Sequence, residues 1–464
     1  MAEFRKILIA NRGEIAIRVM RAANEMGKST VAIFAKEDKL SLHRFKADEA
    51  YQIGEALGPV ASYLNINEII SVAIRAGADA IHPGYGLLSE KPEFAKACNK
   101  AGISFIGPTA EIMEKLGNKA NARKIAEKAG VPVIPASDIL PDNPKDLIKI
   151  AKKLGFPLML KASWGGGGRG MRLINNIEDV EKNILEGKRE AENAFGNSEA
   201  FLERYIKNAR HVEVQILGDK KGNIYHLWER DCSIQRRNQK VIERAPAPYL
   251  KDNQRLVVCE MATKICKHVG YECAGTVEFL MDIDTEEFFF IEVNPRIQVE
   301  HTITEEVTGI DIVRAQIMLS EGANLNEAIG KKNQSDIVCN GHAIQCRITT
   351  EDPLNNFIPD YGRITAYRGA TGMGIRLDGG TAYSGAIITR FYDSLLEKVT
   401  AWAPTPKDAI SRMDRALREF RIRGVSTNIS FVENLLKHKK FKENKYSTKF
   451  IDETPELFQF SERQ

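Results

Sequence analysis

Short apolar strands alternate with amphipathic helices over the first hundred or so residues, and this alternation constrains the fold more than any other feature. We expect helices at residues 15–26 and 66–76, and strands at residues 7–10, 30–34, 80–82 and 104–107. Strands separated by helices predict a parallel, doubly wound sheet, whose ligands lie beyond the carboxyl ends of its strands. That edge carries residues 11–14 (NRGE) and 82–86 (HPGYG). The first loop is not G-x-G-x-x-G, which disfavours a dinucleotide-dependent dehydrogenase.

The rest of the chain mixes helices and strands differently. A chain of 464 residues is long enough for about three lobes. Residues 137–205 form a compact insert with expected strands at 157–162 and 170–174, joined by a glycine-rich turn. From residue 212 onward the pattern becomes rich in strands. We therefore predict an α/β and α+β fold with a small mobile insert.

Composition excludes several classes of protein. The net charge is only +4, so a general attraction to nucleic acid is not supported. No apolar run approaches the length of a membrane span, and the N-terminus lacks a signal-peptide pattern, so we expect a cytoplasmic protein. The seven cysteines are scattered and lack a C-x-x-C pair, which fits buried thiols in a reducing compartment better than a zinc site or disulfides.

Paired carboxylates are predicted in the segment FFFIEVNPRIQVE, residues 288–300. In one extended chain, Glu292, Asn294 and the polar residues up to Glu300 share a face. A hairpin centred near Thr285 would place Glu278 opposite Glu292, with Asn294 one step along the same face. Such oxygen ligands suit Mg²⁺ or Mn²⁺. The alternative is an ordinary solvated hairpin, and a register slip of one residue would remove the site.

Two further segments suggest anion binding. Residues 163–171 (SWGGGGRGM) directly follow Lys161, and backbone amides of consecutive glycines can approach a phosphate closely, although the segment could be only a flexible loop. Lys119 could supply a second cation. Residues 231–246 are dense in cations and amides, which suits a small planar anion or a surface charge cluster. His211 could contact a nucleotide or be structural. No Ser-His-Asp or Cys-His arrangement supports nucleophilic hydrolysis.

Taken in order, several of these motifs resemble one family. KILIANRGEIAIRV, HPGYGLLSE, LKASWGGGGRGM, RHVEVQ, ERDCSIQRRNQK, GTVEF, FIEVNPRIQVEHTITE and IQCRITTEDP are similar to the motifs of biotin carboxylases, members of the ATP-grasp superfamily. LSLHRFKADEAY, HTITEEVTGIDIV, NFIPDYGRITAYR, MDRALREFRIRGVSTN and FIDETPELFQF resemble the N-terminal biotin carboxylase domain of pyruvate carboxylases. The resemblance covers essentially the whole chain.

The resemblance implies an ATP-grasp fold that carboxylates biotin with MgATP and bicarbonate through carboxyphosphate. It implies a nucleotide site made of Lys119, Lys161, Gly167, Gly168, Glu203, Arg204, Tyr205, Ile206, His211, Gln235, Asn238, Glu278 and Glu292. The metal ligands, for Mg²⁺ or Mn²⁺, would be Glu278, Glu292 and Asn294. Bicarbonate would bind to Lys240, Arg296, Gln298 and the Val299 backbone. Glu300 would be the general base, and Arg347 would stabilise the biotin enolate. Some relatives have histidine at the position of Asn238.

The resemblance also implies lobes and partners. The expected divisions are an N-terminal doubly wound lobe (1–115), a helical connector (116–136), a lid (137–205), a central catalytic lobe (206–335), a C-terminal lobe (336–452) and a tail (453–464). The chain has no A-M-K-M motif that would receive biotin. We therefore expect biotin on a carrier elsewhere, a carboxyltransferase domain or subunit, and a homodimer.

Alternatives to this interpretation are a biotin carboxylase subunit of an acetyl-CoA or 2-oxoglutarate carboxylase, another ATP-grasp carboxylate–amine ligase, and a nucleotide-binding scaffold without turnover.

Overall fold

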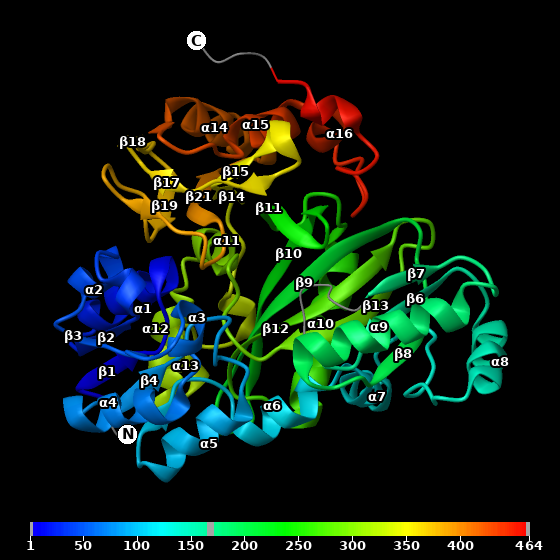
Figure 1. Ribbon diagram of the computed structural model, residues 1–464, viewed down its shortest axis with the longest axis horizontal. Coiled ribbons are helices and arrows are strands. Elements are labelled where there is room, and N and C mark those ends of the chain that lie inside the picture. The colour runs from blue at the N-terminus through cyan, green and yellow to red at the C-terminus, as the bar shows by residue number, and fades with distance from the viewer. Residues whose placement is uncertain (1–2, 165–170, 461–464) are drawn as a thin grey trace.

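The computed structural model describes residues 3–164 and 171–460. Its N-terminal lobe is built on a parallel five-stranded sheet in the order β3-β2-β1-β4-β5 (Figure 1, blue). This order confirms the doubly wound sheet expected from the alternation of strands and helices. The strands are β1 (Lys6–Ile9), β2 (Ser29–Phe34), β3 (Glu49–Gln52), β4 (Ala80–His82) and β5 (Ser104–Phe105). The helices are α1 (Gly13–Glu25), α2 (Leu42–Lys46), α3 (Pro59–Ser62), α4 (Ile66–Ala76) and α5 (Pro92–Lys100).

Local signals set the ends of these helices. The Asn65 side chain accepts the backbone N–H of Glu68 at the start of α4, and Gly77 ends the helix with φ of 65°. A left-handed residue at this position favours glycine, which has no Cβ to clash. The buried face of α4 carries Ile69 and Val72, which pack on the parallel sheet. The polar loops at the carboxyl ends of β1 and β4 are thereby held beside each other, and Asn11 Nδ2 donates to the carbonyl oxygens of Pro83 and Tyr85.

A small lobe projects from the molecule after two connecting helices, α6 (Ala110–Gly117) and α7 (Lys119–Lys128) (Figure 1, right). It contains an antiparallel three-stranded sheet in the order β7-β6-β8. It has its own apolar core, which includes Leu158, Leu160 and Ile184. Its elements are α8 (Pro144–Leu154), β6 (Leu158–Ala162), β7 (Arg172–Ile174), α9 (Val180–Phe195) and β8 (Ala200–Arg204).

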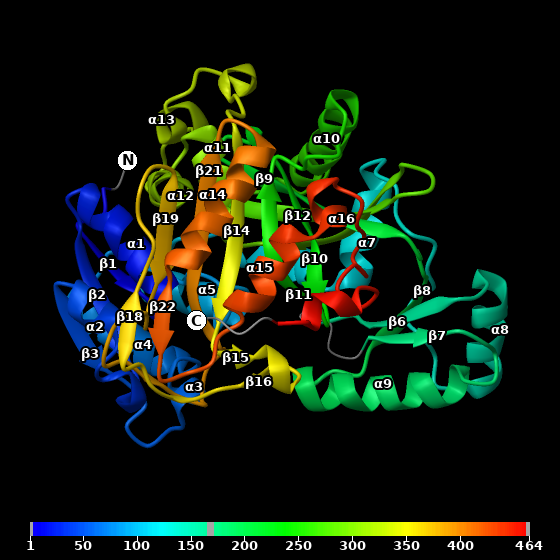
Figure 2. The same ribbon diagram turned by 90° about the horizontal axis from the view of Figure 1, so that it is seen from above.

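An eight-stranded antiparallel sheet forms the rest of the framework, in the order β13-β12-β9-β10-β11-β14-β21-β19. Seen from above, its strands run side by side across the molecule (Figure 2). The sheet continues through the β11–β14 pairing, across the boundary that we expected at residue 336. Its strands are β9 (Ala209–Gly218), β10 (Ile224–Arg236), β11 (Gln239–Ala245), β12 (Cys273–Asp282), β13 (Phe288–Asn294), β14 (His342–Thr349), β19 (Ile375–Gly379) and β21 (Leu395–Ala403).

Helices and short ribbons cover this sheet. The helices are α10 (Asp252–Val269), α11 (His301–Thr308), α12 (Ile312–Ser320), α13 (Leu325–Ile329), α14 (Pro406–Glu419), α15 (Ile429–Lys437) and α16 (Lys439–Lys442). The short strands are β15 (Glu351–Asp352), β16 (Ile358–Pro359), β17 (Gly362–Arg363), β18 (Ala366–Arg368), β20 (Ile387–Ile388) and β22 (Arg421–Arg423). Cys259 and Cys266 on α10 and Cys273 on β12 are free and buried, as the sequence suggested. Across the ranges described, no helix is long and apolar enough to cross a membrane.

The β12–β13 hairpin confirms the predicted pairing and adds a feature that we did not expect. Glu278 lies opposite Glu292, and the register shifts by one residue between this pair and Phe279–Phe290. The shift leaves Ile291 as an extra residue, which is a β-bulge. Phe290 and Val293 consequently both join the apolar core, while Glu292 lies on the opposite face of the strand. Without the bulge, strict alternation would place Glu292 on the same face as Phe290.

The expectation of one extended strand up to Glu300 is wrong. Strand β13 ends at Asn294, and Pro295 follows it directly. Proline has no N–H to continue a ladder. Residues 295–300 form a loop, and Glu300 is the N-cap residue of α11. The polar residues of this segment therefore come together through the loop and not through a common strand face.

Candidate active site

A half-buried lysine contacts three carboxylates at the centre of the large sheet. Lys240 on β11 places its Nζ 2.6 Å from Glu213 Oε2, 3.0 Å from Glu278 Oε1 and 2.7 Å from Glu300 Oε1. Glu213 on β9 is directly paired with Glu278 on β12, which is in turn paired with Glu292 on β13. Three neighbouring strands thus carry a row of three carboxylates. The folded chain brings together the predicted residues Lys240, Glu278 and Glu300, and adds Glu213.

The charges in this cluster fix its protonation. Burial by itself raises the pKa of Glu300, but the charges of Lys240, Arg347 and Arg230 outweigh it and hold that pKa well below its usual range. Burial lowers the pKa of Lys240, but Glu213, Glu278 and Glu300 together raise it well above its usual range. Glu300 is therefore an ionised carboxylate at neutral pH, and Lys240 is a cation. An anion that enters the cluster would meet both a fixed cation and a proton acceptor.

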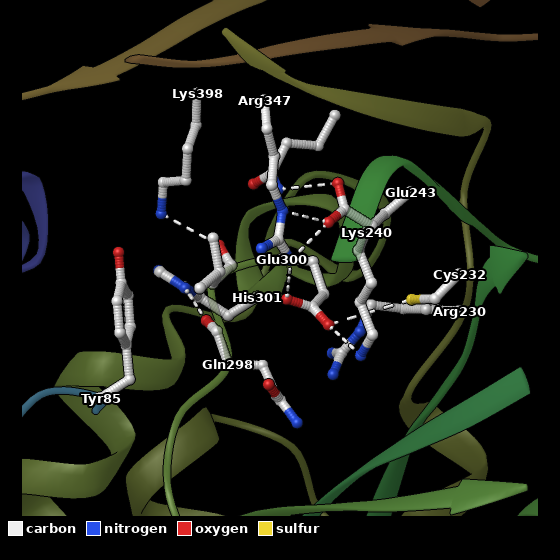
Figure 3. A network of polar contacts seen from close by, with 12 residues as sticks. Tyr85, Arg230, Cys232, Lys240, Glu243, Gln298, Glu300, His301, Arg347 and Lys398 are labelled. Atoms are coloured by element: carbon white, nitrogen blue, oxygen red, sulfur yellow. Dashed lines mark hydrogen bonds and ion pairs between the residues drawn. The ribbon is translucent and has the colours of Figure 1, made fainter. Parts of the chain in front are cut away.

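Arg347 on β14 contacts the other oxygen of Glu300 (Figure 3). Its Nη2 lies 2.9 Å from Glu300 Oε2, and its Nε donates to Glu243 Oε1 at 2.6 Å. Glu300 is fully buried, so both of its oxygens require partners. Cys232 lies on the same side as Lys240, with its Sγ 3.9 Å from Glu300 Oε1. The carboxylate is held between one cation from β11 and one from β14.

The predicted metal ligands lie together at the edge of this cluster. Asn294 Nδ2 donates to Glu278 Oε1 at 2.9 Å, and Lys119 Nζ pairs with Glu292 Oε2 at 2.6 Å. His211 Nε2 lies 2.9 Å from the second oxygen of Glu278. Carboxylate and amide oxygens on adjacent strands fit a hard divalent cation such as Mg²⁺. Glu213 belongs to two groups with metal-binding spacing, one with His211 and Glu278 and one with Cys232 and Glu300.

The loop before Glu300 presents donors toward the same region. Arg296 Nε lies 3.1 Å from Glu90 of the N-terminal lobe, and its guanidinium also contacts Gln298 Oε1 and Asn294 Oδ1. Gln298 Nε2 donates to Glu278 Oε1 at 3.3 Å. The Val299 carbonyl accepts from Lys398. Arg296 and Gln298 thus lie beside the carboxylate cluster, as expected for a site that binds a small anion.

The remaining predicted nucleotide residues lie on the small lobe and the β10–β11 hairpin. Lys161 on β6 pairs with Glu203 on the neighbouring β8. Gln235 Nε2 lies 2.8 Å from His211 Nδ1, so these two residues meet.

Asn238 is exposed in the turn between β10 and β11. Arg204, Tyr205 and Ile206 lie at and just beyond the end of β8. Gly167 and Gly168 lie outside the described residues.

Sequence reasoning missed several residues of the cluster. Glu213, Glu243 and Arg230 are buried completely, and Arg230 Nε donates to Glu213 Oε1 at 2.6 Å. In an extended RHVEVQ segment, Glu213 lies on the same face as His211. This alternation could have predicted that Glu213 belongs to the site. Nothing in the local pattern distinguishes the buried Arg230 from the half-buried Arg236 or the exposed Arg237. The cation-rich segment 231–246 is in fact one hairpin that is buried at its base and exposed at its tip.

Three family models match successive parts of the chain. "Biotin carboxylase, N-terminal domain" matches residues 3–113, "Carbamoyl-phosphate synthase L chain, ATP binding domain" matches residues 118–328, and "Biotin carboxylase C-terminal domain" matches residues 345–453.

Curated and solved relatives agree with these matches. Pyruvate carboxylase of Staphylococcus aureus is 56% identical over 460 residues, which are 99% of this chain and 40% of the relative. A Rhizobium etli pyruvate carboxylase structure with the allosteric activator acetyl coenzyme A has a TM-score of 0.96 at 64% identity, covering 100% of this chain and 41% of that chain. The biotin carboxylase domain dimer of Hydrogenobacter thermophilus 2-oxoglutarate carboxylase, in complex with MgADP, ADP and bicarbonate, also has a TM-score of 0.96, at 44% identity and 100% coverage of both chains. The chain thus spans about two fifths of the length of the pyruvate carboxylases that it matches.

Proposed function

Because the chain belongs to the biotin carboxylase family of ATP-grasp proteins, we propose that it uses ATP and bicarbonate to carboxylate biotin that a carrier presents. The observation that carries this proposal is the ionised Glu300, which lies between Lys240 and Arg347 at the end of the Arg296–Glu300 loop. A buried base flanked by fixed cations suits an anionic substrate that must lose a proton.

In the first step, this chain orients bicarbonate and removes its proton. Lys240, Arg296, Gln298 and the Val299 backbone would hold the anion. Glu300 would accept its proton on the oxygen that faces Lys240. The pKa of Glu300 is held low by Lys240, so we expect an incoming anion to draw the amine partly away from the carboxylate and to strengthen the base. Deprotonated bicarbonate then attacks the γ-phosphoryl group of ATP and gives carboxyphosphate and ADP.

The nucleotide would lie across the row of carboxylates and the small lobe. Lys119, Lys161, Gly167 and Gly168 would hold its phosphates. Glu203 to Ile206 would form the adenine-binding connector, with His211, Gln235 and Asn238 beside the nucleotide. Glu278, Glu292 and Asn294 would hold Mg²⁺ or Mn²⁺, which supplies charge neutralisation during phosphoryl transfer. Binding of that ion would replace the contact that Lys119 now makes with Glu292 and free the lysine for phosphate.

In the second step, Arg347 would stabilise the biotin enolate. Carboxyphosphate breaks down to CO₂ and phosphate, and the phosphate accepts the proton of the biotin ureido nitrogen. That nitrogen then attacks CO₂. Arg347 contacts Glu300, which supports a common site for the two steps. Keeping water away from this site protects carboxyphosphate from hydrolysis, and we propose residues 137–205 as the lid that does so.

The wider assembly is also part of the proposal. The similarity to pyruvate carboxylases supports a role in the first half-reaction of pyruvate carboxylation, with a biotin carrier and a carboxyltransferase supplied elsewhere. The biotin carboxylase domain of the 2-oxoglutarate carboxylase is described as a dimer, which supports a homodimer of this chain. A cytoplasmic location, the expected lobe boundaries and the roles of the named residues belong to the same proposal. The second candidate, a subunit of a 2-oxoglutarate carboxylase, is favoured by the match along the whole of that domain.

ADP release with and without bicarbonate and free biotin tests the proposed function. Glu300→Gln should lower bicarbonate-dependent turnover by at least about 100-fold, because general-base catalysis is lost, while MgATP still binds. Glu229→Gln is a matched control, since Glu229 is equally buried and pairs with Arg255 at 2.8 Å outside the cluster. ADP release that does not depend on bicarbonate, or equal loss in both variants, would contradict the proposal.

A further inference from the structure

A buried lysine contacts the segment that precedes Glu300. Lys398 lies on β21, is fully buried, and is paired across the sheet with Arg347 on β14 and with Asp378 on β19. Figure 3 shows Lys398 and Arg347 extending from the same sheet toward the segment that carries Glu300. The side chains of two paired residues on β14 and β21 thus both contact the segment 299–300. Arg347 contacts the Glu300 side chain, and Lys398 contacts the main chain just before it.

The contacts of Lys398 link three parts of the molecule. Its Nζ donates to the carbonyl oxygen of Val299 at 3.0 Å and lies 3.0 Å from Glu14 Oε2 on α1. The other oxygen of Glu14 accepts the hydroxyl of Tyr85, from the loop after β4. The amine is therefore held by a carboxylate of the N-terminal lobe while it holds a carbonyl beside the proposed base.

The main chain before Glu300 is held from a second direction. His301 Nδ1 lies 2.8 Å from the Gln298 carbonyl oxygen. Burial, together with the charges of Lys398, Arg18 and Arg376, lowers the pKa of His301 well below its usual range. The ring is neutral, so the contact requires the tautomer that carries its proton on Nδ1. The carbonyls of Gln298 and Val299 are thus both fixed by side-chain donors.

Burying an ammonium group is costly unless it is paired. An uncharged side chain would fill the space behind Val299 without the cost of desolvating an ammonium group. The charge of Lys398 is therefore better explained by a specific role than by packing. A charged donor forms a stronger and more directional contact with a carbonyl than a neutral donor does. Such a contact is useful where a short loop must hold a base within a fraction of an ångström of its substrate.

We infer that Lys398 is a positioning residue for Glu300. Through the Val299 carbonyl it fixes the loop so that Gln298, the Val299 backbone and the Glu300 carboxylate face one bound bicarbonate. Through Glu14 it ties that alignment to the N-terminal lobe. The inference rests on the proposed function for its catalytic consequence, but the loop ordering that it describes can be measured without any turnover.

Lys398→Met tests this role because it keeps most of the side-chain length and removes the charge. Lys28→Met is the matched control. Lys28 is also a buried lysine that donates to one main-chain carbonyl, that of Phe4 at 2.9 Å, and pairs with one carboxylate, Glu321. Glu14→Gln is a second and milder variant, which keeps Lys398 and the Tyr85 contact but removes the anion that orients the amine.

Amide hydrogen exchange gives the readout that is independent of activity. The N–H groups of His301 and Ile303 donate to the carbonyls of Gln298 and Glu300 in the first turn of α11. In Lys398→Met we expect these two amides to exchange at least about tenfold faster, because the loop opens locally, whereas in Lys28→Met they should not change. Unchanged exchange in a folded Lys398→Met protein, or the same change in both variants, would overturn the inference.

The kinetic readout separates positioning from general destabilisation. We expect kcat/KM for bicarbonate to fall about tenfold or more in Lys398→Met, through misplacement of the base, while KM for MgATP changes less than about twofold. Glu14→Gln should also lower kcat/KM for bicarbonate, but by a smaller factor. If Lys398→Met does not fold, the inference is tested with Glu14→Gln instead. An equal loss for bicarbonate and MgATP would overturn the positioning role. If the unmodified protein lacks bicarbonate-dependent turnover, the proposed function fails, while hydrogen exchange still decides whether Lys398 orders the loop.

Discussion

Several fully buried charged side chains lie close to the loop that precedes α11. Glu213, Glu243 and Glu300 are fully buried, and so is Arg230. Lys240 pairs with two of these three carboxylates. Such clusters rarely add stability over a well-packed apolar core, because desolvation costs about as much as the attraction returns. Their concentration beside one loop is better explained by a reaction that handles anions and protons.

One buried carboxyl outside this cluster makes stability depend on pH. Glu397 on β21 is buried and accepts the Tyr367 hydroxyl at 2.6 Å. Burial is the main cause that raises its pKa to about 7; the Tyr367 hydrogen bond lowers it and the charge of Asp378 raises it. Between about pH 4.5 and pH 7 the folded protein therefore keeps a proton that the unfolded chain releases. The contribution of Glu397 to the free energy of unfolding should therefore fall with rising pH across this window and level off above it.

Glu397→Gln should remove this dependence, because the amide keeps an acceptor for Tyr367 and does not ionise. Relative to the unmodified protein, the variant should gain about 3 kcal/mol in unfolding free energy between pH 5 and pH 8. Chemical denaturation at both pH values measures this gain. Glu260→Gln, an exposed position on α10, should keep the pH dependence of the unmodified protein. Parallel behaviour of Glu397→Gln and the unmodified protein would show that Glu397 is ionised throughout.

Two irregular elements place proposed site residues. The bulge at Ile291 lets β13 contribute Phe290 to the core and Glu292 to the row of carboxylates. The turn between β10 and β11 consists of Arg237 and Asn238, with φ values of 49° and 62°. Two successive positive φ values define a type I′ turn, which suits the right-handed twist of a hairpin and favours asparagine or glycine. The turn holds the proposed nucleotide contact Asn238 at the tip of the hairpin.

Glycine substitutions in this turn separate backbone geometry from side-chain contact. Both Asn238→Gly and Arg237→Gly keep the positive φ values without strain. If Asn238 donates to the nucleotide, Asn238→Gly should raise KM for MgATP about fivefold, the value of one hydrogen bond, with KM for bicarbonate unchanged. Arg237→Gly should leave both constants near those of the unmodified protein. Steady-state kinetics decides the matter, and matching values in the two variants would remove Asn238 from the nucleotide site.

The lobes are joined by buried charges as well as by the shared sheet. Glu305 on α11 accepts from Arg18 on α1 at 2.8 Å and from Arg376 on β19 at 2.7 Å. The Glu305 carboxylate therefore connects the N-terminal lobe to β19, the edge strand of the large sheet. Arg18 also pairs with Asp311, and Arg376 also pairs with Asp378. This arrangement couples the packing of the lobes.

A double-mutant cycle on Arg18→Met and Arg376→Met measures that coupling. Because both guanidinium groups share Glu305, their effects on the free energy of unfolding should depart from additivity by about 1 kcal/mol or more. Arg18→Met combined with Arg255→Met is the control, since Arg255 pairs with Glu229 and shares no partner with Arg18. Equilibrium denaturation of the single and double variants supplies the values. Additive effects in the first cycle would contradict coupling through Glu305.

Patterns among neighbouring residues were enough to predict the N-terminal sheet and the pairing of β12 with β13. Alternating strands and helices predicted the parallel sheet, and the short hairpin predicted Glu278 opposite Glu292, because side-chain period and turn position depend only on neighbouring residues. The motifs identified the family. The folded chain was needed to show that Glu213 joins the row and that Lys240 contacts Glu300. It also showed that Arg347 and Lys398 reach the segment before α11. These contacts depend on which strands become neighbours in the large sheet, and that choice follows from the packing of apolar faces contributed by distant parts of the chain.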